Sequence, residues 1–206
     1  MQRILKKKIA SVLPKSKGLW LDITNSTKEL KIKKGEQLIQ YRDLCKSVYV
    51  LVDGALECKL HKNRSNSQTV WFYFDERFDV IVNFDSYYKN QPTKYSVTAI
   101  EDSVVFEFKK EEVEAWRRKY EQFNEFYKND MLRAFMDYHE IRNYMLVMSS
   151  EEYLEYLEKN YAFITNRLSS QKLAHFMGIT PEWLSKVKQR RNNSKKSAAP
   201  MLKMAN

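Results

Sequence analysis

The sequence predicts an α+β protein in which an antiparallel β domain is followed by a long helix and a C-terminal helix-turn-helix. Short alternating runs of apolar residues between about residues 29 and 108 favour strands. From Lys110 onward the apolar residues instead follow a helical repeat. The segment 170–191, SQKLAHFMGITPEWLSKVKQRR, then has the pattern of two helices that meet at a glycine corner.

Charge is distributed unevenly along the 206 residues, whose formal net charge is +10. Residues 1–40 hold ten basic and three acidic residues, residues 41–159 hold seventeen and 22, and residues 160–206 hold nine and one. A basic C-terminal segment behind an acidic middle is typical of a module that binds phosphates. The alternative is a charged tail that is merely solvated.

Several classes of protein are disfavoured by composition. No apolar run is long enough to cross a membrane. The basic N-terminus, MQRILKKKIASVLPKSK, has too short an apolar stretch for a signal peptide. Cys45 and Cys58 lack the spacing of metal ligands, so neither zinc nor an iron–sulfur cluster is indicated. We therefore expect a cytoplasmic protein without a bound metal or cofactor.

The β region is predicted from short strands bounded by turn residues. Asp53-Gly54 is a typical two-residue hairpin turn, so we expect the strands before and after it to pair. A polar loop, Lys62–Ser67, precedes the third strand, and the last two strands are expected to pair around Glu101-Asp102. This spacing favours a sandwich or barrel over a parallel sheet. The predicted strands are Val48–Val52, Ala55–Leu60, Thr69–Phe74, Tyr95–Ile100 and Val104–Phe108.

The long helix carries two apolar stripes. The first has the spacing of a coiled-coil heptad and is here called the predicted seam: Tyr127, Met131, Ala134, Tyr138, Ile141, Met145 and Met148. The second stripe is expected to pack against the β domain: Phe123, Phe126, Leu132, Phe135 and Leu146. Since one β domain would not cover both stripes, we favour a homodimer that pairs through the seam. The alternative is one long helix buried within a single chain.

The segment 170–191 predicts a helix-turn-helix of the kind that binds DNA. Gly178 tolerates the left-handed conformation at the end of a helix, and Thr180-Pro181 is a favourable start for the next helix. Leu184 and Val187 are predicted to face inward. Outward-facing polar residues could contact bases in the major groove, where Lys pairs with guanine, Glu with cytosine and Gln with adenine. The predicted base contacts are Glu182, Ser185, Lys186 and Gln189. The alternative is an ordinary surface helical hairpin.

In this order, these segments resemble the Crp/Fnr (cyclic-AMP receptor/Fnr) family of bacterial transcription regulators, from roughly Lys28 to Arg191. The matching motifs are Lys34-Gly35-Glu36 before a strand, SVYVLVDGALE, YSVTAIEDSVVFEF and the helix-turn-helix segment. The last motif resembles Bacteroidetes-type members, in which a Gly-Ile-Thr-Pro-Glu turn is followed by Leu-Ser and a basic residue.

The resemblance implies a jelly-roll sensor domain of the cyclic-nucleotide-binding type within residues 1–110. It further implies a dimerisation helix over 111–149 and a winged-helix-type DNA-binding domain over 150–192. The basic tail, 193–206, lacks apolar periodicity and is predicted to be disordered. Double-stranded DNA and a second copy of the chain are the expected partners, with RNA polymerase as a further candidate.

The same resemblance assigns roles within the helix-turn-helix. Glu182, Ser185 and Lys186 would face bases. Lys186 stands where members more often have Arg, so its contact with guanine would not be bidentate. Phosphate contacts position a protein on DNA without specifying sequence, and the predicted contacts of this kind are Gln171, Thr180, Lys188, Arg190 and Arg191.

The expected sensor site departs from the family pattern. Members that bind a cyclic nucleotide carry a Gly-Glu pair and, about ten residues later, an Arg-Ser pair for the phosphate. The corresponding stretch here, FDVIVNFDSYYKNQPTKYSVTA, contains neither Gly nor Arg, and Thr93-Lys94 stand at the Arg-Ser position. We therefore predict that cyclic AMP is not the ligand, and the effector is unknown. Lys94 is the one weak candidate contact for an effector, against the alternative of a solvated lysine.

Three functions are compatible with this order of elements. The first is a homodimeric transcription regulator. The second is a small-molecule sensor or protein-interaction module on the same fold that no longer binds DNA specifically. The third is an enzyme on a jelly-roll scaffold, which in cupin-type enzymes requires several histidines on strands. The β region offers only His61, so we predict that the chain is not an enzyme, and the C-terminal charge favours the first function.

Overall fold

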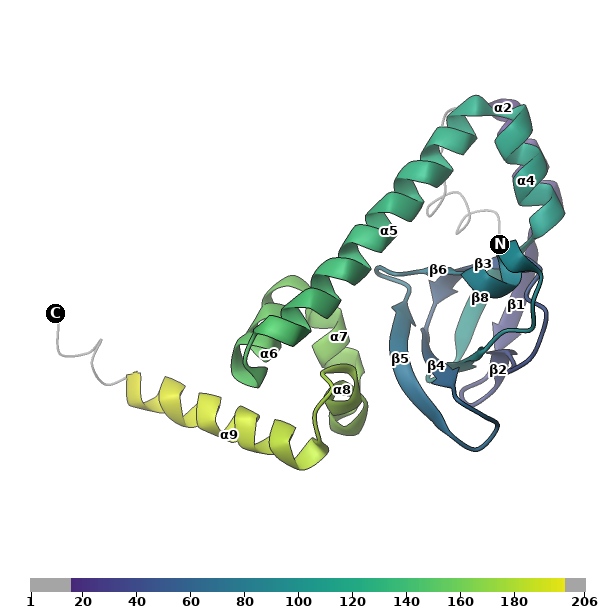
Figure 1. The fold of residues 1–206 in the computed structure, drawn as a ribbon. Coiled ribbons are helices and arrows are strands. Elements are labelled where there is room, and N and C mark those ends of the chain that lie inside the picture. The colour runs from purple at the N-terminus through teal and green to yellow at the C-terminus, as the bar shows by residue number, and fades with distance from the viewer. Residues whose placement is uncertain (1–15, 199–206) are drawn as a thin grey trace, which may run out of the picture. The chain divides into compact units, whose positions relative to one another are not determined.

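The computed structural model describes residues 16–198, and within this range the side chains of all residues except Asn192 and residues 194–198. The chain divides into two compact units, with the boundary between Phe135 and Met136 (Figure 1). The N-terminal unit contains the strands, and the described part of the C-terminal unit is helical. The predicted α+β class, with an antiparallel β domain before the helices, is confirmed.

The strands of the described region form two four-stranded antiparallel sheets. Their order is β1-β8-β3-β6 in the first sheet and β2-β7-β4-β5 in the second. All five predicted strands are present, within two residues at each end. The strands are β1 (Lys28–Ile32), β2 (Gln37–Ile39), β3 (Ser47–Asp53), β4 (Ala55–His61), β5 (Ser67–Phe74), β6 (Val80–Ile81), β7 (Tyr95–Ala99) and β8 (Ser103–Lys109).

Two predicted hairpins are wrong. The turn at Asp53-Gly54 leads from β3 in the first sheet to β4 in the second, and the turn at Glu101-Asp102 leads from β7 back to β8. The two turns pack closely against each other: a Cβ added to Gly54 would lie only 2.3 Å from Ser103 Oγ. A turn dipeptide shows where the chain reverses, whereas sheet partners depend on which strand faces are buried together. The predicted loop between β4 and β5 does join a paired hairpin.

Helices cover one face of the first sheet. Side chains that alternate along β3 and β8 pack with apolar residues of α2 (Lys17–Ser26) and α4 (Lys110–Lys119). Trp116 lies at the centre of an aromatic chain, with edge-to-face contacts to Phe108 and Phe123, each 5.9 Å between ring centroids. This cluster forms the core of the N-terminal unit: Leu19, Ile23, Val48, Val52, Tyr87, Phe106, Phe108, Val113, Trp116 and Phe123.

The single long helix predicted over 111–149 is instead two helices, α4 and α5 (Glu121–Val147). The break falls at Tyr120, whose backbone is extended at φ −123° and ψ 99°. The Tyr120 hydroxyl donates a 2.7 Å hydrogen bond to Asp22 of α2, so this residue is held against a neighbouring helix. Apolar periodicity continues through the break, which is why the sequence pattern did not reveal it.

The C-terminal unit consists of the last turns of α5 and the four helices that follow. No strand follows β8 in the described residues, so they include no wing of the kind that the family resemblance implied. The final helix also continues to Ala198, beyond residue 193, where the tail was predicted to start; residues 199–206 lie outside the described region. The four helices are α6 (Ser150–Asn160), α7 (Ala162–Arg167), α8 (Ser170–Phe176) and α9 (Pro181–Ala198).

Candidate functional sites

The corner between α8 and α9 has the geometry that the sequence predicts. Gly178 adopts φ +69°, in the left-handed region where glycine is favoured. The N–H of Ile179 donates to the C=O of Ala174, and the N–H of Gly178 donates to the C=O of His175. These two hydrogen bonds are those of a Schellman motif, which satisfies carbonyl groups at the end of a helix. The chain therefore leaves α8 in a fixed direction.

The start of α9 orients its polar side chains. Thr180 caps the helix, because its hydroxyl accepts a 3.2 Å hydrogen bond from the N–H of Trp183. Leu184 and Val187 are each 1% exposed, which confirms the predicted inward face. The four predicted base contacts are all exposed on the opposite side, and we call them the outer face of α9: Glu182, Ser185, Lys186 and Gln189.

Glu182 has a local role in addition to its place on the outer face. Its own backbone N–H and the Thr180 hydroxyl hold the pKa of the Glu182 carboxyl below its ordinary value. A carboxylate in the first turn of a helix also interacts favourably with the positive end of the helix dipole. The side chain thus remains charged and able to accept a hydrogen bond at neutral pH.

The predicted phosphate contacts divide into two groups. Gln171, Thr180 and Lys188 are exposed. The two arginines instead have acidic partners on α6. Arg191 pairs with Glu158 at 2.9 Å and its side chain is only 15% exposed, while Arg190 lies 3.8 Å from Glu151. Arg191 therefore helps to attach α9 to α6, and its place in the structure does not favour the predicted contact.

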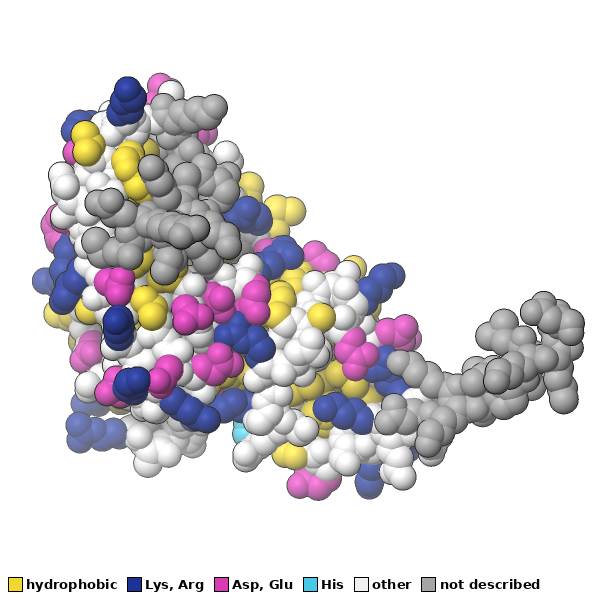
Figure 2. All heavy atoms as spheres, turned by 180° about the vertical axis from the view of Figure 1, so that it is seen from behind, with side chains coloured by type: hydrophobic (Ala, Val, Ile, Leu, Met, Phe, Trp, Pro, Cys, Tyr) yellow, Lys and Arg dark blue, Asp and Glu magenta, His cyan; other side chains and the backbone are white. Residues whose placement is uncertain are grey.

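Charges on the N-terminal unit do not form a single basic surface on the face seen in Figure 2. Lys and Arg side chains there alternate with Asp and Glu side chains. Exposed ion pairs of the N-terminal unit include Lys33–Asp102 at 2.8 Å and Lys89–Asp85. Along the sequence, residues 1–40 and residues 160–206 each have an excess of basic residues, and residues 41–159 have an excess of acidic ones.

Along α5, the residues that are buried within the chain do not coincide with either of the two predicted stripes. Ile141 of the predicted seam is fully buried within its own chain, where the Tyr153 hydroxyl of α6 donates to its carbonyl. Tyr127 is half-buried against the N-terminal core, and its hydroxyl lies 2.8 Å from that of Tyr88. These two residues are therefore not free to meet a partner along a continuous seam. Of the remaining seam residues, Met131, Met145 and Met148 are half-buried, and Ala134 and Tyr138 are exposed.

A different set of apolar side chains is exposed on α5. Of the second stripe, Phe123 and Phe126 pack on the N-terminal core as predicted, but Leu132, Phe135 and Leu146 are 57%, 63% and 76% exposed. These apolar side chains of α5 are thus largely exposed to solvent. We call these residues the exposed face of α5: Leu132, Phe135, Met136, Tyr138, Leu146 and Val147.

The Arg-Ser position of the expected sensor site is occupied by a structural threonine. The N–H of Thr93 donates to Asp43 O at 2.8 Å, and its C=O accepts from the N–H of Arg42 at 2.9 Å. The Thr93 hydroxyl accepts a further hydrogen bond from the N–H of Tyr95, and the residue is buried. Lys94 beside it is exposed. Thr93 therefore fixes the chain at this position, and neither Thr93 nor Lys94 supplies a guanidinium fork for a phosphate.

The helix next to this position, α3 (Phe84–Lys89), presents aromatic rings outward. Phe84 and Tyr88 are about half exposed and stack with ring centroids 6.4 Å apart. Asp85 of the same helix is paired with Lys89, and this ion pair lowers the pKa of its carboxyl.

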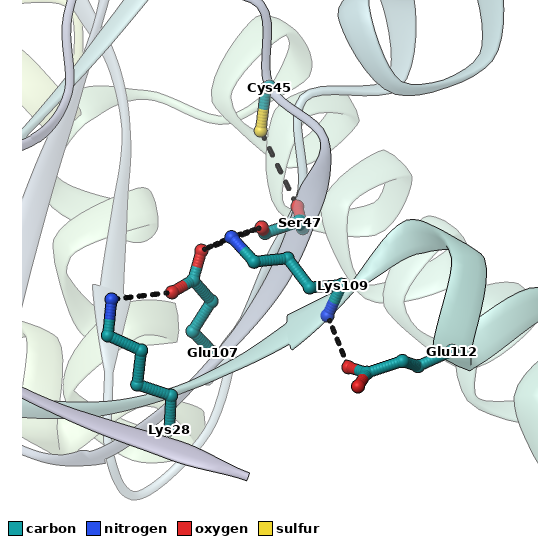
Figure 3. A network of polar contacts seen from close by, with 6 residues as sticks. All are labelled: Lys28, Cys45, Ser47, Glu107, Lys109 and Glu112. Atoms are coloured by element: carbon teal, nitrogen blue, oxygen red, sulfur yellow. Dashed lines mark hydrogen bonds and ion pairs between the residues drawn. The ribbon is translucent and has the colours of Figure 1, made fainter. Parts of the chain in front are cut away.

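A buried carboxylate was missed by the sequence analysis. Glu107 of β8 has a side chain that is 8% exposed and lies at the centre of a polar network (Figure 3). Its Oε1 accepts from Ser47 Oγ at 2.8 Å and from Lys109 Nζ at 2.7 Å, and Lys28 Nζ lies 3.6 Å from Oε2. Burial by itself raises the pKa of Glu107, but the two lysines and Ser47 outweigh it, so the pKa is lowered. Its charge is thus compensated within the fold.

The two cysteines and His61 are held in surroundings that indicate a structural role. Burial raises the pKa of both thiols, that of Cys58 to about 12, so both are neutral at physiological pH. His61 Nε2 lies 2.8 Å from Ser96 Oγ, and its ring stacks on Tyr41. Within the described residues there is no group of three or more His, Cys, Asp or Glu side chains that could hold a metal ion.

Comparison with known proteins agrees with this architecture. Residues 29–120 match the family model described as the cyclic nucleotide-binding domain. The fold resembles FixK2 from Bradyrhizobium japonicum, with a TM-score of 0.64 and 16% identity over 82% of this chain and 86% of that one. It also resembles the c-di-GMP responsive global regulator CLP of Xanthomonas campestris, with a TM-score of 0.66 and 9% identity over 87% and 93% of the two chains.

A transcriptional regulator assigned to the crp/fnr family, from Eubacterium rectale, is similar as well. Its TM-score is 0.64, with 12% identity over 92% of this chain and 87% of that one. No curated protein sequence matches the chain. At these identities the likeness establishes the fold: a cyclic nucleotide-binding domain followed by a helical helix-turn-helix unit, as in Crp/Fnr regulators. No helix of the described residues is long and apolar enough to span a membrane.

Proposed function

We propose that this protein is a homodimeric, sequence-specific DNA-binding transcription regulator of the Crp/Fnr type. The observation that supports it most directly is the outer face of α9, where Glu182, Ser185, Lys186 and Gln189 project together from a capped helix after a rigid corner. Such a helix fits the major groove, and these residue types can pair with base edges. RNA polymerase is a further proposed partner, since regulators of this type act on transcription.

The proposed dimer uses the exposed face of α5 rather than the predicted seam. Leu132, Phe135 and Met136 lie within a little more than one turn and are each more than half exposed. Clustered apolar side chains of this kind on a soluble protein indicate a partner surface. A second copy of the chain is the favoured occupant, because a two-fold dimer would present two α9 helices to two half-sites on DNA.

Cyclic AMP is not the proposed effector. Thr93 uses its backbone groups and its hydroxyl to fix the chain, and Lys94 alone cannot form the two parallel hydrogen bonds that an arginine offers a phosphate. The proposed sensor domain thus has a degenerate cyclic-nucleotide site. Its effector, if the protein has one, belongs to another chemical class.

Selection of DNA by the purified full-length protein tests the proposal. Fragments of the host genome, or a random duplex library, would be captured, and the bound sequences determined. We expect enrichment of a two-fold symmetric sequence with half-sites about one helical turn apart. Lys186→Glu should abolish the sequence preference, and Lys188→Glu should weaken binding to all sequences.

The charge-matched control is Lys159→Glu, which alters an exposed lysine at the end of α6. It should change binding much less than either reversal on α9. Recovery of random fragments, or equal effects of all three reversals, would contradict sequence-specific recognition. That result would favour the alternative, a sensor or protein-interaction module on the same fold.

A further inference from the structure

Two side-chain contacts join α9 to the first turn of α6, and a third contact within α9 connects them. Trp183 Nε1 donates a 3.0 Å hydrogen bond to Ser150 Oγ. The guanidinium of Arg190 lies over the Trp183 ring, 5.3 Å from its centroid, and also reaches Glu151 at 3.8 Å. All four residues belong to the C-terminal unit. We call this group of four residues the Trp183 latch.

Trp183 is not an ordinary core residue. It is 39% exposed, whereas Leu184 and Val187, which attach α9 to the other helices, are each 1% exposed. Apolar contacts of the latter kind are non-directional and permit small rotations of a helix. A hydrogen bond from the indole N–H and a stacked guanidinium are directional. Together with the Arg191–Glu158 ion pair, the latch therefore supplies directional contacts that oppose rotation of α9 about its axis.

The position of the latch links two functional parts of the chain. On α9, Trp183 directly follows Glu182 and lies within one turn of Lys186, so its rotation sets the direction of the outer face. On α6, Ser150 directly follows the helix cap Ser149, only three residues after α5 ends at Val147. The last turns of α5 also contact the corner of the helix-turn-helix, because a Cβ on Gly178 would lie 3.6 Å from Met145 Sδ.

We propose that the Trp183 latch positions the outer face of α9 for sequence-specific recognition and couples it to the corner between α5 and α6. This proposal rests on the proposed DNA-binding function. Trp183 and Ser150 act as positioning residues and contact no base. Contacts to base edges require close alignment, whereas phosphate contacts tolerate displacement. Loss of the latch therefore weakens binding to the specific sequence and leaves binding to unrelated DNA nearly unchanged.

The first experiment examines the latch in the DNA-free, full-length protein. The four tryptophan indole N–H signals are recorded by NMR, and the signal of Trp183 is the one lost in Trp183→Phe. We expect this N–H to exchange slowly with solvent in the native protein and in Ser150→Thr, which keeps the acceptor. In Ser150→Ala the exchange should become fast. A Trp183 signal that exchanges as fast in the native protein as in Ser150→Ala overturns the latch.

The second experiment measures binding to the selected duplex and to a random-sequence duplex. We expect Trp183→Phe and Ser150→Ala each to raise the Kd for the selected duplex about fivefold, and the Kd for random duplex by less than about twofold. The double variant should be no weaker than either single variant, because both remove the same bond. Ser150→Thr should bind like the native protein.

Equal losses on both duplexes, or additive effects in the double variant, overturn the positioning role. If Trp183→Phe does not fold, the comparison of Ser150→Ala with Ser150→Thr decides the question by itself. A protected indole in a protein that selects no DNA sequence overturns the proposed function, and the role in recognition with it. The NMR result thus separates failure of the latch from failure of DNA binding.

Discussion

At the scale of single residues, polar side chains in buried positions determine much of the local structure. Thr93 takes the place where a cyclic-nucleotide site would have a phosphate ligand and uses its hydrogen bonds to hold the chain together. Glu107 brings a negative charge into the first sheet and is compensated by Lys109, Lys28 and Ser47. Both residues illustrate that a buried polar group stabilises a fold only when it is paired.

The stability of Glu107→Gln is predicted to depend on pH. Because the native pKa of Glu107 lies below its ordinary value of 4.5, its charge stabilises the native state above that pH. This contribution is lost as the pH falls through the native pKa. We expect the variant to be less stable by about 2 kcal/mol at pH 7, and this difference should shrink as the pH falls below 4.5.

Urea unfolding of both proteins across this pH range measures the difference in free energy of unfolding. Glu111→Gln, which alters an exposed carboxylate on α4, is the control and should show a small difference at every pH. A destabilisation of Glu107→Gln that does not change with pH would mean that lost packing, and not lost charge, is responsible.

The two glycine corners are predicted to respond differently to alanine. Both have positive φ, at +98° for Gly54 and +69° for Gly178. A Cβ on Gly54 would also lie 2.7 Å from the backbone oxygen of Asp102, whereas on Gly178 the nearest atom would be Met145 Sδ at 3.6 Å. Gly178→Ala should therefore lower the free energy of unfolding by about 1 kcal/mol, from backbone strain alone. Gly54→Ala should lower it by clearly more, because a steric clash is added to the strain. Thermal unfolding of the two variants gives the comparison, and equal costs would contradict it.

At the scale of elements, α5 combines residues that pack within the chain with residues that are exposed on its surface. Its first turns pack on the N-terminal core through Phe123 and Phe126, and its last turns are covered by α6 around Ile141. The residues of the exposed face of α5 are each more than two-fifths exposed. A heptad pattern identifies apolar positions but does not distinguish the positions that pack within a chain from those that meet a partner.

A pair of substitutions on α5 separates these two roles. Leu132→Glu places a charge on the exposed face and should convert the proposed dimer to a monomer without a large change in thermal stability. Ile141→Glu buries a charge and should destabilise the C-terminal unit by about 3 kcal/mol or more. Light scattering and thermal unfolding of both variants test this assignment. A dimer that persists in Leu132→Glu would show that the second copy binds elsewhere.

At the scale of the whole molecule, the chain combines a cyclic nucleotide-binding domain with a basic helix-turn-helix unit. The boundary between the two compact units falls within α5, so the end of this helix belongs to the same body as α9. Any effector signal that moves the last turns of α5 would thereby also move the helix proposed to contact DNA.

Cyclic AMP is predicted to have no effect on the whole protein. Titration calorimetry with millimolar cyclic AMP should show no heat of binding, and the nucleotide should not change DNA binding, because the phosphate ligands of the family pattern are missing. Thr93→Arg with Lys94→Ser is not expected to restore binding, since Thr93 is 1% exposed, too buried for an arginine side chain, and its hydroxyl accepts from the N–H of Tyr95. A micromolar affinity in the native protein would contradict the proposal of a degenerate site.

Local patterns in the sequence determined the elements and their chemistry. Alternation located five strands, Gly178 and Thr180 marked the corner and the cap, and the spacing of polar residues defined the outer face of α9. These features depend on residues within a few positions of one another, which a sequence displays directly. The fold class followed because the order of the elements is also local information.

Tertiary structure alone decided which residues meet across long separations. It placed β3 and β4 in different sheets, broke the helix at Tyr120, buried Ile141, gave Glu107 its partners and connected Trp183 to Ser150. Each of these outcomes depends on what covers a side chain once the chain is packed. The periodicity of apolar residues shows that one face of a helix or strand must be covered. Only the packing of the folded chain decides which other element covers it.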